Sequence, residues 1–493
     1  RASGEGTPVA TSSECETPRT SRACCIRPRA GASERGGQDT LAPAQKPNSE
    51  SDGEAAIIDP LRDIDVYLKM ASENNANIKY IFETHFHADF VSGHVDLAKK
   101  TGAKIVYGPN ADASFDFHKG SDGEVFNVGN VSIELLHTPG HTMESSCFLL
   151  SDENGNKHSV FTGDTLFVGD VGRPDLAVKS ADITQEDLAA MLFDSLRSKL
   201  MPLPDHIIVF PAHGAGSACG KNIGSETSST IGEQKQSNYA LQNISKEQFV
   251  TEVTDGLLAP PAYFFTDVKM NKMGYDDLDV VIAKNLKPLM YSEFTELYKD
   301  DVVILDSRSP QDFSKGFIKG SINIGLKGQY APWVGAILSP ESPLLLITDN
   351  GFEREAITRL ARVGYENVIG FLDGGVDSYE GNLEVITNNS PEEATDKINQ
   401  GHKHILDVRK PGERSNGYIS QSTHIRLQEL PQKMAKLNKE DNIMVYCAGG
   451  YRSMIACSIL AANGFEKTIN VEGGFSKLSQ QDVPLTLGES CSN

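Results

Sequence analysis

Long apolar runs, a surplus of positive charge and paired cysteines are all missing from this sequence of 493 residues. No stretch of about 18 or more apolar residues occurs, so no membrane-spanning helix is expected. Lys and Arg number 46 against 67 Asp and Glu, and the net charge of −21 argues against non-specific binding to nucleic acid or to anionic membranes. A local basic pocket for a small anion remains compatible with that charge.

Cysteine is sparse, with eight in the chain, and none of them forms a C-x-x-C pair. Their uneven spacing excludes a disulfide framework and favours a reducing compartment, so we expect a cytoplasmic protein, with the mitochondrial matrix as the alternative. The missing C-x-x-C pair also speaks against a structural zinc site. Cys147 and Cys457 lie in apolar segments and are predicted to be inert core residues.

Residues 1–50 differ from the rest in being rich in Ser, Gly, Pro, Thr and Arg and nearly without large apolar residues. Such a segment buries too little surface to offset its ordering entropy, so we predict a disordered or aberrant N-terminal segment. A transit peptide is the alternative, although acidic residues such as Glu5, Glu14, Glu16, Glu34 and Asp39 are unusual in one and no apolar region for secretion is present.

From Glu54 onward, short apolar segments alternate with amphipathic ones, which is typical of an α/β fold. The segment IDVYLKMASENN is predicted to be a helix, and a Pro- and Gly-bearing connection follows at residues 255–285. The predicted strands are AAIIDP, IKYIFET, AKIVYGP, VFNVGNVSIELLHTPG, SSCFLLSD, HSVFTGD and HIIVFPAHG.

Two later blocks repeat one order of features: a strand, D-x-R, G-[FY]-I, a strand, a loop, a helix, G-[FY]-E and a final GG. This order predicts two copies of one small α/β domain. The expected organisation is therefore a larger domain at residues 51–275 and two small domains at 285–385 and 390–485.

Histidine and aspartate recur at the ends of the predicted strands of the first domain. His85, His87 and Asp89 lie in THFHADF, directly after a strand, where α/β folds place their ligands. The donors that follow later strands are His137 and His141 in HTPGHT, Asp164 in FTGDT and His213 in FPAHG. Imidazoles combined with carboxylates suit a divalent metal, so the sequence predicts a metal centre.

The runs HFHADF, TPGHT, TGDT and PAHG, in this order, resemble the metallo-β-lactamase superfamily over about residues 54–240. The resemblance implies an αββα sandwich with the metal at one edge of two sheets. Phe90 stands where the superfamily motif H-x-H-x-D-H has its last histidine, which removes a donor from the second position of a two-metal hydrolase.

A one-metal site remains, and His85, His141 and Asp164 make the set of two histidines and one carboxylate associated with non-haem Fe(II) oxygenases. This arrangement is similar to that of the persulfide dioxygenases, in which the matching residues bind iron, so one Fe(II) per chain is expected. His87, Asp89 and His213 would then orient the ligands or belong to a second metal. A glyoxalase II-like thioester hydrolase, binding zinc, is the alternative.

Two more loops of this domain fit an anionic thiol substrate. Arg173, in GDVGRPD, resembles the Arg-bearing loop of the dioxygenases and could bind a substrate carboxylate, or else pair with Asp170 or Asp175. Cys219, in SACGK, is expected either to contact a sulfane sulfur or to be a plain packing residue.

The second small domain carries a cysteine in a loop between a strand and a helix, CAGGYR. Its glycines and the following helix N-terminus are expected to direct backbone N–H groups and partial positive charge at Cys447. The loop resembles that of the rhodanese sulfurtransferases, which implies a persulfide on Cys447 and an anion-holding role for Arg452. The first copy has Asp349 at the cysteine position and is predicted to be inactive, with Asp306-x-Arg308 as a fold feature.

These features favour a persulfide dioxygenase–sulfurtransferase of hydrogen sulfide detoxification. The expected substrates are glutathione persulfide or a similar low-molecular-weight persulfide and O2, with sulfite as product and Cys447 transferring sulfane sulfur, for example onto sulfite. The thiol carrier, the direction of sulfur flow and homo-oligomer formation stay open. A non-enzymatic scaffold is a third reading, which the intact cysteine loop opposes.

Metal domains of this superfamily normally begin with two or three strands before the segment that matches AAIIDP. Here the polar residues 1–50 take their place, so those strands are expected to be missing and the domain to be less stable than a complete relative.

Overall fold

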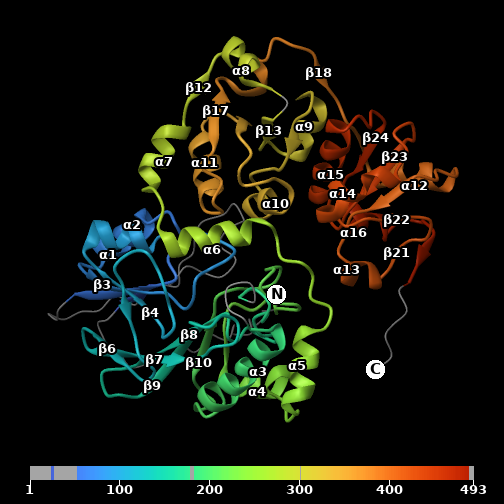
Figure 1. Ribbon diagram of the computed structural model, residues 1–493. Helices are drawn as coiled ribbons and strands as arrows, with labels where there is room; N and C mark the ends of the chain where they lie inside the picture. The colour runs from blue at the N-terminus through green and yellow to red at the C-terminus, as the bar shows by residue number, and fades with distance from the viewer. Residues whose placement is uncertain (1–23, 27–52, 178–182, 300, 488–493) are drawn as a thin grey trace, which may run out of the picture.

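The computed structural model describes residues 24–26, 53–177, 183–299 and 301–487. They form a large domain, coloured blue to green in Figure 1, and two smaller domains in yellow-orange and red. The expected α/β class is confirmed, as an αββα sandwich followed by two small α/β domains. Among the described helices, none combines the length and apolar character needed to cross a lipid bilayer.

The large domain, called the metal domain below because it carries the predicted metal ligands, is built on two sheets. The first is parallel, in the order β1-β2-β3-β4-β5, and the second has the order β11-β10-β9-β8-β7-β6, in which β9 and β10 are parallel and the other pairs antiparallel. The bounds are β1 Cys24–Ile26, β2 Glu54–Ile58, β3 Asn77–Phe82, β4 Lys104–Tyr107, β5 His118–Lys119, β6 Val125–Val128, β7 Val131–His137, β8 Ser146–Ser151, β9 Lys157–Gly163, β10 Ile208–Pro211 and β11 Ser229–Thr230. Every strand predicted from the sequence of this domain is present.

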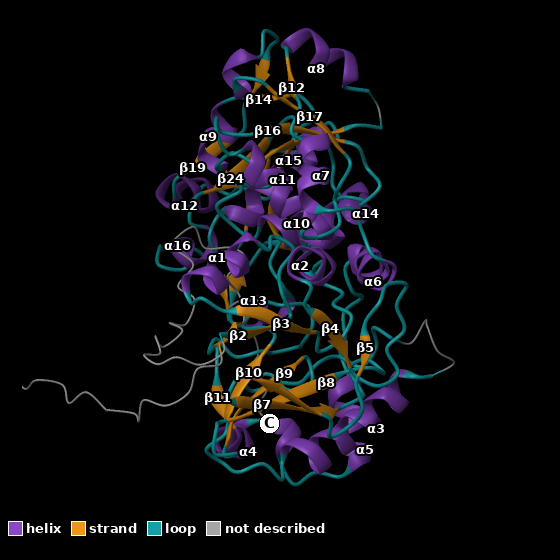
Figure 2. Cartoon of the chain, turned by 90° about the vertical axis from the view of Figure 1, so that its left-hand side faces the viewer, coloured by secondary structure: helices purple, strands orange, loops and turns teal. Residues whose placement is uncertain are grey.

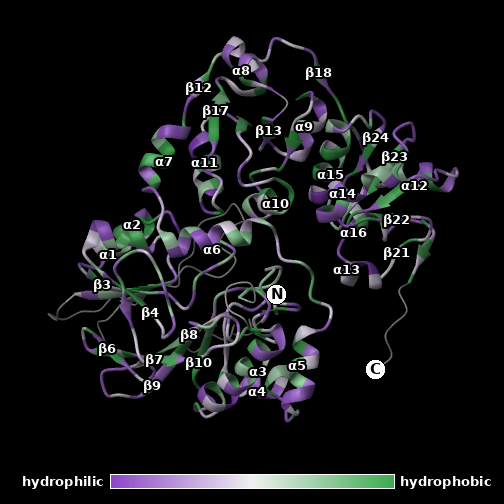
Figure 3. Cartoon of the chain, in the orientation of Figure 1, coloured by the Kyte–Doolittle hydropathy of each residue, from purple (hydrophilic) through white to green (hydrophobic). Residues whose placement is uncertain are grey.

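Strand alternation divides the apolar side chains between two cores. In β2, Ala55 and Ile57 face the helices while Ala56 and Ile58 face the second sheet, as a period of two requires. Helices α1 (Asp65–Glu73) and α2 (His94–Thr101) cover the first sheet. The helices on the outer side of the second sheet are α3 (Gln185–Ser195), α4 (Ile231–Ser237) and α5 (Lys246–Thr254) (Figure 2). In Figure 3 strands such as β10 carry apolar colour, whereas helices such as α4 and α5 carry both apolar and polar colour.

Of residues 1–50, the structure describes Cys24–Ile26, which pair in parallel with β2 at its outer edge. The remainder of that segment lies outside the described residues. The expectations of disorder and of missing first strands therefore stay predictions.

The two small domains have the same sheet topology. Their sheets are parallel, in the orders β12-β17-β16-β13-β15 and β19-β24-β23-β20-β22. The first contains β12 Pro288–Leu289, α8 Tyr291–Leu297, β13 Val303–Asp306, α9 Pro310–Lys315, β15 Ile322–Asn323, α10 Tyr330–Ile337, β16 Leu344–Ile347, α11 Glu353–Ala361 and β17 Val368–Leu372. The second contains β19 Thr387–Asn389, α12 Pro391–Asn399, β20 Ile405–Asp407, α13 Pro411–Ser415, β22 Thr423–His424, α14 Leu430–Lys433, β23 Ile443–Tyr446, α15 Tyr451–Ala462, β24 Thr468–Val471 and α16 Gly474–Leu478.

The D-x-R motif plays the same structural part in both copies. Arg308 binds the Asp306 carboxylate and donates to Gly316 O at 2.9 Å, and Arg409 binds Asp407 and donates to Gly417 O at 2.9 Å. The motif thus ties the end of the first buried strand to the turn eight residues later, which confirms the internal repeat and its role as a fold feature.

The connection at residues 255–285 is more ordered than the sequence indicates. It forms α6 (Tyr263–Met273) and α7 (Leu278–Asn285), and α6 runs between the metal domain and the first small domain (Figure 1). The Asn271 side chain donates to the carbonyls of His87 and Phe90, each at 2.8 Å. Contacts with residues far away in the chain, rather than a regular spacing of apolar residues, hold α6 in place. The apolar pattern of this segment therefore did not predict a helix.

Candidate functional site

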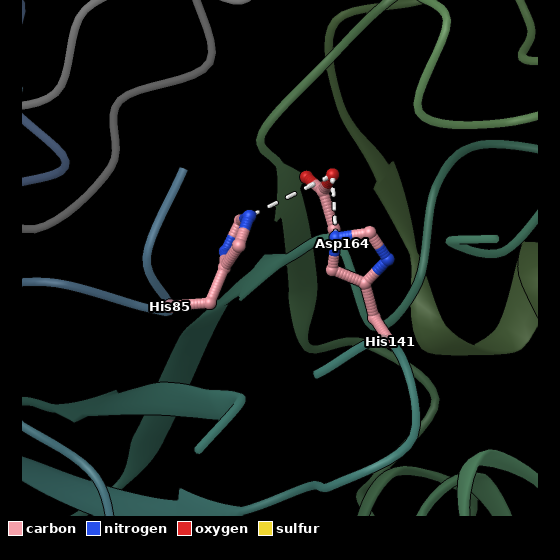
Figure 4. A group of neighbouring side chains, drawn as sticks. All are labelled: His85, His141 and Asp164. Carbon is pink, nitrogen blue, oxygen red and sulfur yellow. Dashed lines mark ion pairs between the residues drawn. The ribbon is translucent and has the colours of Figure 1, made fainter. Parts of the chain in front are cut away.

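Three loops at one edge of the sandwich bring His85, His141 and Asp164 together. His85 follows β3, His141 follows β7 and Asp164 follows β9. His141 Nε2 lies 3.4 Å and His85 Nε2 3.8 Å from Asp164 Oδ2 (Figure 4). All three side chains are buried, and their donor atoms lie within 4.8 Å of one another.

Hydrogen bonds fix both imidazoles with Nε2 free to bind a metal. His141 Nδ1 lies 2.8 Å from the carbonyl of Arg173, which can only accept, so Nδ1 carries the proton. The Thr84 hydroxyl donates to Asp59 and therefore accepts from His85 Nδ1 at 2.9 Å. Burial, and then the neighbouring histidines, hold the pKa of His85 well below its usual range, which keeps the imidazole neutral.

The Asp164 carboxylate is the feature that calls for a cation. Its side chain is fully buried, and within the described ranges neither carboxylate oxygen has a hydrogen-bond partner. A buried carboxylate without partners is costly, whereas a divalent cation between it and two imidazoles would satisfy it. The residues present therefore fit a metal ion with two nitrogen ligands and one oxygen ligand.

His87 points away from this set. Its Nε2 lies 3.1 Å from Asp59 Oδ1 and 3.5 Å from Glu83 Oε2, and the three side chains form a separate buried group. Burial raises the pKa of Glu83 to about 7, and the two carboxyl groups raise the pKa of His87 against the effect of its burial. Both expected roles of His87, orienting the ligands and belonging to a second metal, stay predictions.

His137, the other histidine of HTPGHT, lies outside all of these groups. Its Nε2 contacts the carbonyl of Met143 at 3.0 Å, which places it as a loop-stabilising residue. The expectation that it is a metal donor is wrong, because its ring binds the backbone of its own loop.

Asp89, His213 and Cys219 form a further group beside Asp164, again with donor atoms within 4.8 Å of one another. His213 Nε2 lies 3.4 Å from Asp89 Oδ2 and 3.3 Å from Asp164 Oδ1. Burial and the charges of Asp89 and Asp164 hold the pKa of Cys219 well above its usual range. Cys219 thus faces the centre as a neutral thiol when no cation is near.

Arg173 is occupied by protein groups. Its guanidinium makes two 2.7 Å bonds to Asp175 and further bonds to the carbonyls of Ala218 and Leu258. The structure therefore favours the salt-bridge reading of Arg173, which holds the Cys219 loop in place. Binding of a substrate carboxylate by Arg173 stays a prediction.

The loop of the second small domain curls around Cys447 as expected. Gly450, at φ +96°, donates its N–H to Cys447 Sγ at 3.1 Å, at the start of α15. The sulfur therefore lies at a helix N-terminus, where an anionic form is stabilised. Cys147 and Cys457 are buried core residues, as expected, and burial raises the pKa of Cys147 to about 11.

A cavity of about 550 Å³ opens onto Cys447 at the junction of all three domains. Its lining consists of Gly216, Lys327, Gly328, Gln329, Trp333, Lys410, Glu413, Cys447, Gly449, Tyr451 and Arg452. Gly216 comes from the loop after His213, and the residues from Lys327 to Trp333 come from the copy without a cysteine. Asp349, which takes the cysteine position in that copy, is exposed.

Sequence reasoning missed several of these residues. Asp59 ends a strand that was recognised, and Glu83 immediately precedes the metal loop, so their positions were a signal that could have been used. Lys327 and Trp333 had no signal, because only the packing of two domains brings them to Cys447.

Comparison with known families agrees with this arrangement. The sequence model of the metallo-beta-lactamase superfamily matches residues 50–213, and that of the rhodanese-like domain matches residues 291–382 and 390–481. A crystal structure of a metallo-beta-lactamase from Staphylococcus aureus subsp. aureus COL is 34% identical, with a TM-score of 0.57, and the match covers 65% of this chain and 91% of that one.

Persulfide dioxygenases and hydroxyacylglutathione hydrolases both occur among the curated relatives. The mitochondrial persulfide dioxygenase ETHE1 of Mus musculus is 30% identical over 209 residues, which are 42% of this chain and 73% of that protein. A probable hydroxyacylglutathione hydrolase of Schizosaccharomyces pombe is 34% identical over 168 residues, which are 33% of this chain. The chain spans 60% of the length of that hydrolase and 58% of a second one from the same organism.

Proposed function

Because this chain belongs to the metallo-beta-lactamase superfamily and carries two rhodanese-like domains, we propose that it is a persulfide dioxygenase–sulfurtransferase. Its substrates are a low-molecular-weight thiol persulfide, such as glutathione persulfide, and O2. The balanced reaction is RSSH + O2 + H2O → RSH + SO3²⁻ + 2H⁺, in which the sulfane sulfur is oxidised and O2 is reduced.

The observation that carries the proposal is the buried Asp164 carboxylate facing two free imidazole nitrogens. Iron(II) held by His85, His141 and Asp164 would supply open coordination positions and the redox chemistry that O2 requires. The protein fixes the two imidazoles through Thr84 and the Arg173 carbonyl, so that both nitrogens are aimed before any ligand arrives. This preorganisation keeps the reacting groups in one orientation.

The sulfurtransferase part is assigned to Cys447. A persulfide on its sulfur would be stabilised by the Gly450 N–H and the start of α15. Transfer to sulfite is balanced as Cys–S–S⁻ + SO3²⁻ → Cys–S⁻ + S2O3²⁻, in which one S–S bond breaks and another forms. Lys327 and Lys410 line the cavity and supply positive charge for the dianion.

The alternative is a thioester hydrolase like the hydroxyacylglutathione hydrolases among the relatives. Two features of this chain weigh against it. Phe90 removes a histidine from the second metal position, and His87 is held by Asp59 and Glu83 away from the first.

O2 uptake by iron-loaded protein given glutathione persulfide tests the proposal. We expect stoichiometric consumption of O2 with formation of sulfite, and no hydrolysis of a glutathione thioester. Thioester hydrolysis without O2 uptake would refute the dioxygenase and support the hydrolase. Asp164→Ala is expected to abolish O2 uptake, and the matched control Asp152→Ala, in the exposed β8–β9 turn, to retain it.

A further inference from the structure

We propose that Asn271, near the end of α6, is a positioning residue of the metal centre, because it holds the backbone on both sides of Asp89. This inference rests on the metal centre of the proposed function. Helix α6 spans Tyr263–Met273, whereas the match to the superfamily model ends at residue 213. Metal binding in this chain therefore depends on a segment that the sequence indicated only as a connection between domains.

The Asn271 side chain spends its hydrogen bonds on one short stretch of backbone. Its nitrogen donates to the carbonyls of His87 and Phe90, each at 2.8 Å, and its oxygen accepts from the Ser92 N–H at 2.9 Å. A backbone N–H can only donate, so this last bond fixes which end of the amide carries the oxygen. Asn271 is fully buried, and water therefore does not compete for these bonds.

The two carbonyls that Asn271 binds lie on either side of Asp89 in the sequence. Asp89 Oδ2 is 3.4 Å from His213 Nε2, and the same nitrogen is 3.3 Å from Asp164 Oδ1. Among the described residues, the other Asp89 oxygen is buried without a hydrogen-bond partner. The direction of Asp89 thus depends on the backbone that carries it, and a shift of this backbone would be passed through His213 to the metal-binding carboxylate of Asp164.

Further contacts from outside the metal domain hold the same stretch of backbone. The Tyr275 hydroxyl donates to Ser92 O and accepts from the Val95 N–H at 3.3 Å. The Val91 N–H donates at 2.7 Å to the carbonyl of Arg362, directly after α11 of the first small domain. The copy without a cysteine therefore takes a structural part in the metal centre, since its helix end and α6 together fix the loop that follows β3.

The aspartate variant separates positioning from space filling. A side chain that only fills space at this point needs the right size but no N–H donors. Asn271→Asp keeps the size and the acceptor for the Ser92 N–H, but it places an oxygen opposite the carbonyl oxygens of His87 and Phe90. Those carbonyls lose their donors in a buried place, and the backbone around Asp89 is expected to shift.

Titration of the full-length, metal-free protein with Co²⁺ under anaerobic conditions tests this proposal, because the visible bands of bound Co²⁺ report the geometry of its ligands. Asp164→Ala identifies the part of the signal that belongs to this centre. We expect Asn271→Asp and Asn271→Ala to weaken Co²⁺ binding about ten- to 100-fold and to alter the bands. Asn285→Ala is the matched control and is expected to keep both, since Asn285 is equally buried but donates to the carbonyl of Glu366 at 2.9 Å.

Tyr275→Phe provides a second test that removes a single oxygen atom and disturbs folding least. We expect a smaller loss of Co²⁺ affinity in the same direction. Wild-type affinity and bands in Asn271→Asp, an equal loss in Asn285→Ala, or unchanged affinity in Tyr275→Phe would overturn the proposal. None of these measurements involves O2 or a persulfide, so the expected Co²⁺ results without O2 uptake would refute the dioxygenase and leave the role of Asn271 standing.

Discussion

The guanidinium of Arg452 lies against the carboxylate of Glu413, with its two terminal nitrogens donating at 2.6 and 2.7 Å. Arg452 is the second residue of α15 and lines the same cavity as Cys447, and Glu413 lies on α13. Burial acts to lower the pKa of Arg452, but the Glu413 bond and the nearby Cys447 sulfur raise it. The positive charge of Arg452, which acts on the Cys447 sulfur, is thus already paired with a protein carboxylate.

Glu413→Gln is therefore expected to improve the binding of anionic sulfur acceptors. Removal of the carboxylate frees Arg452 to face the cavity, and the gain in binding free energy should be about 0.2–1 kcal/mol, which corresponds to a KM for sulfite lower by a factor of about 1.4–5. Steady-state thiosulfate formation measures it. A higher KM would show that Glu413 is needed to position Arg452.

Lys327→Ala is expected to raise the KM for sulfite roughly three- to tenfold with little change in kcat, because this lysine lines the cavity without holding the sulfur. Lys319→Ala, on the same domain and 79% exposed beside Glu384, is the matched control. Equal kinetics for the two variants would contradict a role of the first copy in the cavity.

Cys447→Ser is expected to abolish sulfur transfer and to leave O2 uptake intact, because serine cannot carry a persulfide and Cys447 belongs to a different domain from the metal set. Thiosulfate and O2 assays on the same sample check both halves. Residual thiosulfate formation at the wild-type rate would remove Cys447 from the mechanism.

Asp164→Asn is expected to change metal binding and stability in opposite directions. The amide is a poor metal ligand, so iron content should fall to background. The free energy of unfolding of the metal-free protein should rise by about 1–3 kcal/mol, because a buried carboxylate without hydrogen bonds becomes a neutral group. Metal analysis and thermal unfolding of the metal-free protein measure the two effects, and a lower melting temperature would contradict the second.

Asp407→Asn is expected to be more destabilising than Asp306→Asn at neutral pH. Asp407 pairs with both Arg409 and Arg414, at 2.8 and 3.0 Å, and its loss leaves the buried Arg409 charge uncompensated, at a cost of about 3–5 kcal/mol. Asp306 pairs with Arg308. Thermal unfolding of the full-length variants gives the comparison. Equal losses of stability in the two variants would show that the pairing of Asp407 with Arg414 is not important.

The contributions of Asp407 and Asp306 to folding stability should depend on pH with opposite signs. Burial acts to raise the pKa of Asp407, but the hydrogen bonds and the charge of Arg409 lower it. The stabilisation that Asp407 contributes to the folded state is therefore present above the unfolded pKa of about 3.9, and it is lost as the pH falls through the folded pKa. Burial raises the pKa of Asp306 despite Arg308, so that group costs stability as the pH rises from the unfolded to the folded pKa. Below about pH 4 the acid dependence of unfolding should therefore weaken in Asp407→Asn, and above about pH 4 it should steepen in Asp306→Asn.

The sequence by itself determined the fold class and the repeat, and it named the residues of the candidate metal centre. Strand-end positions predicted that donors including His85, His141 and Asp164 would gather, because the ligands of α/β folds lie in the loops that follow their strands, and the structure brings these three together at one edge of the sandwich. The conformation of the Cys447 loop could also be predicted from the sequence, since it depends on consecutive residues and on the helix that follows them.

Tertiary structure alone decided how the remaining charged side chains are used. His87 faces Asp59 and Glu83, Arg173 is bound by Asp175, and Arg452 by Glu413. Cys219 reached the metal centre, and Lys327 reached Cys447, only through the packing of segments far apart in the chain. The direction of a side chain depends on which oppositely charged or hydrogen-bonding group folding brings near it, and spacing along the sequence does not contain that information.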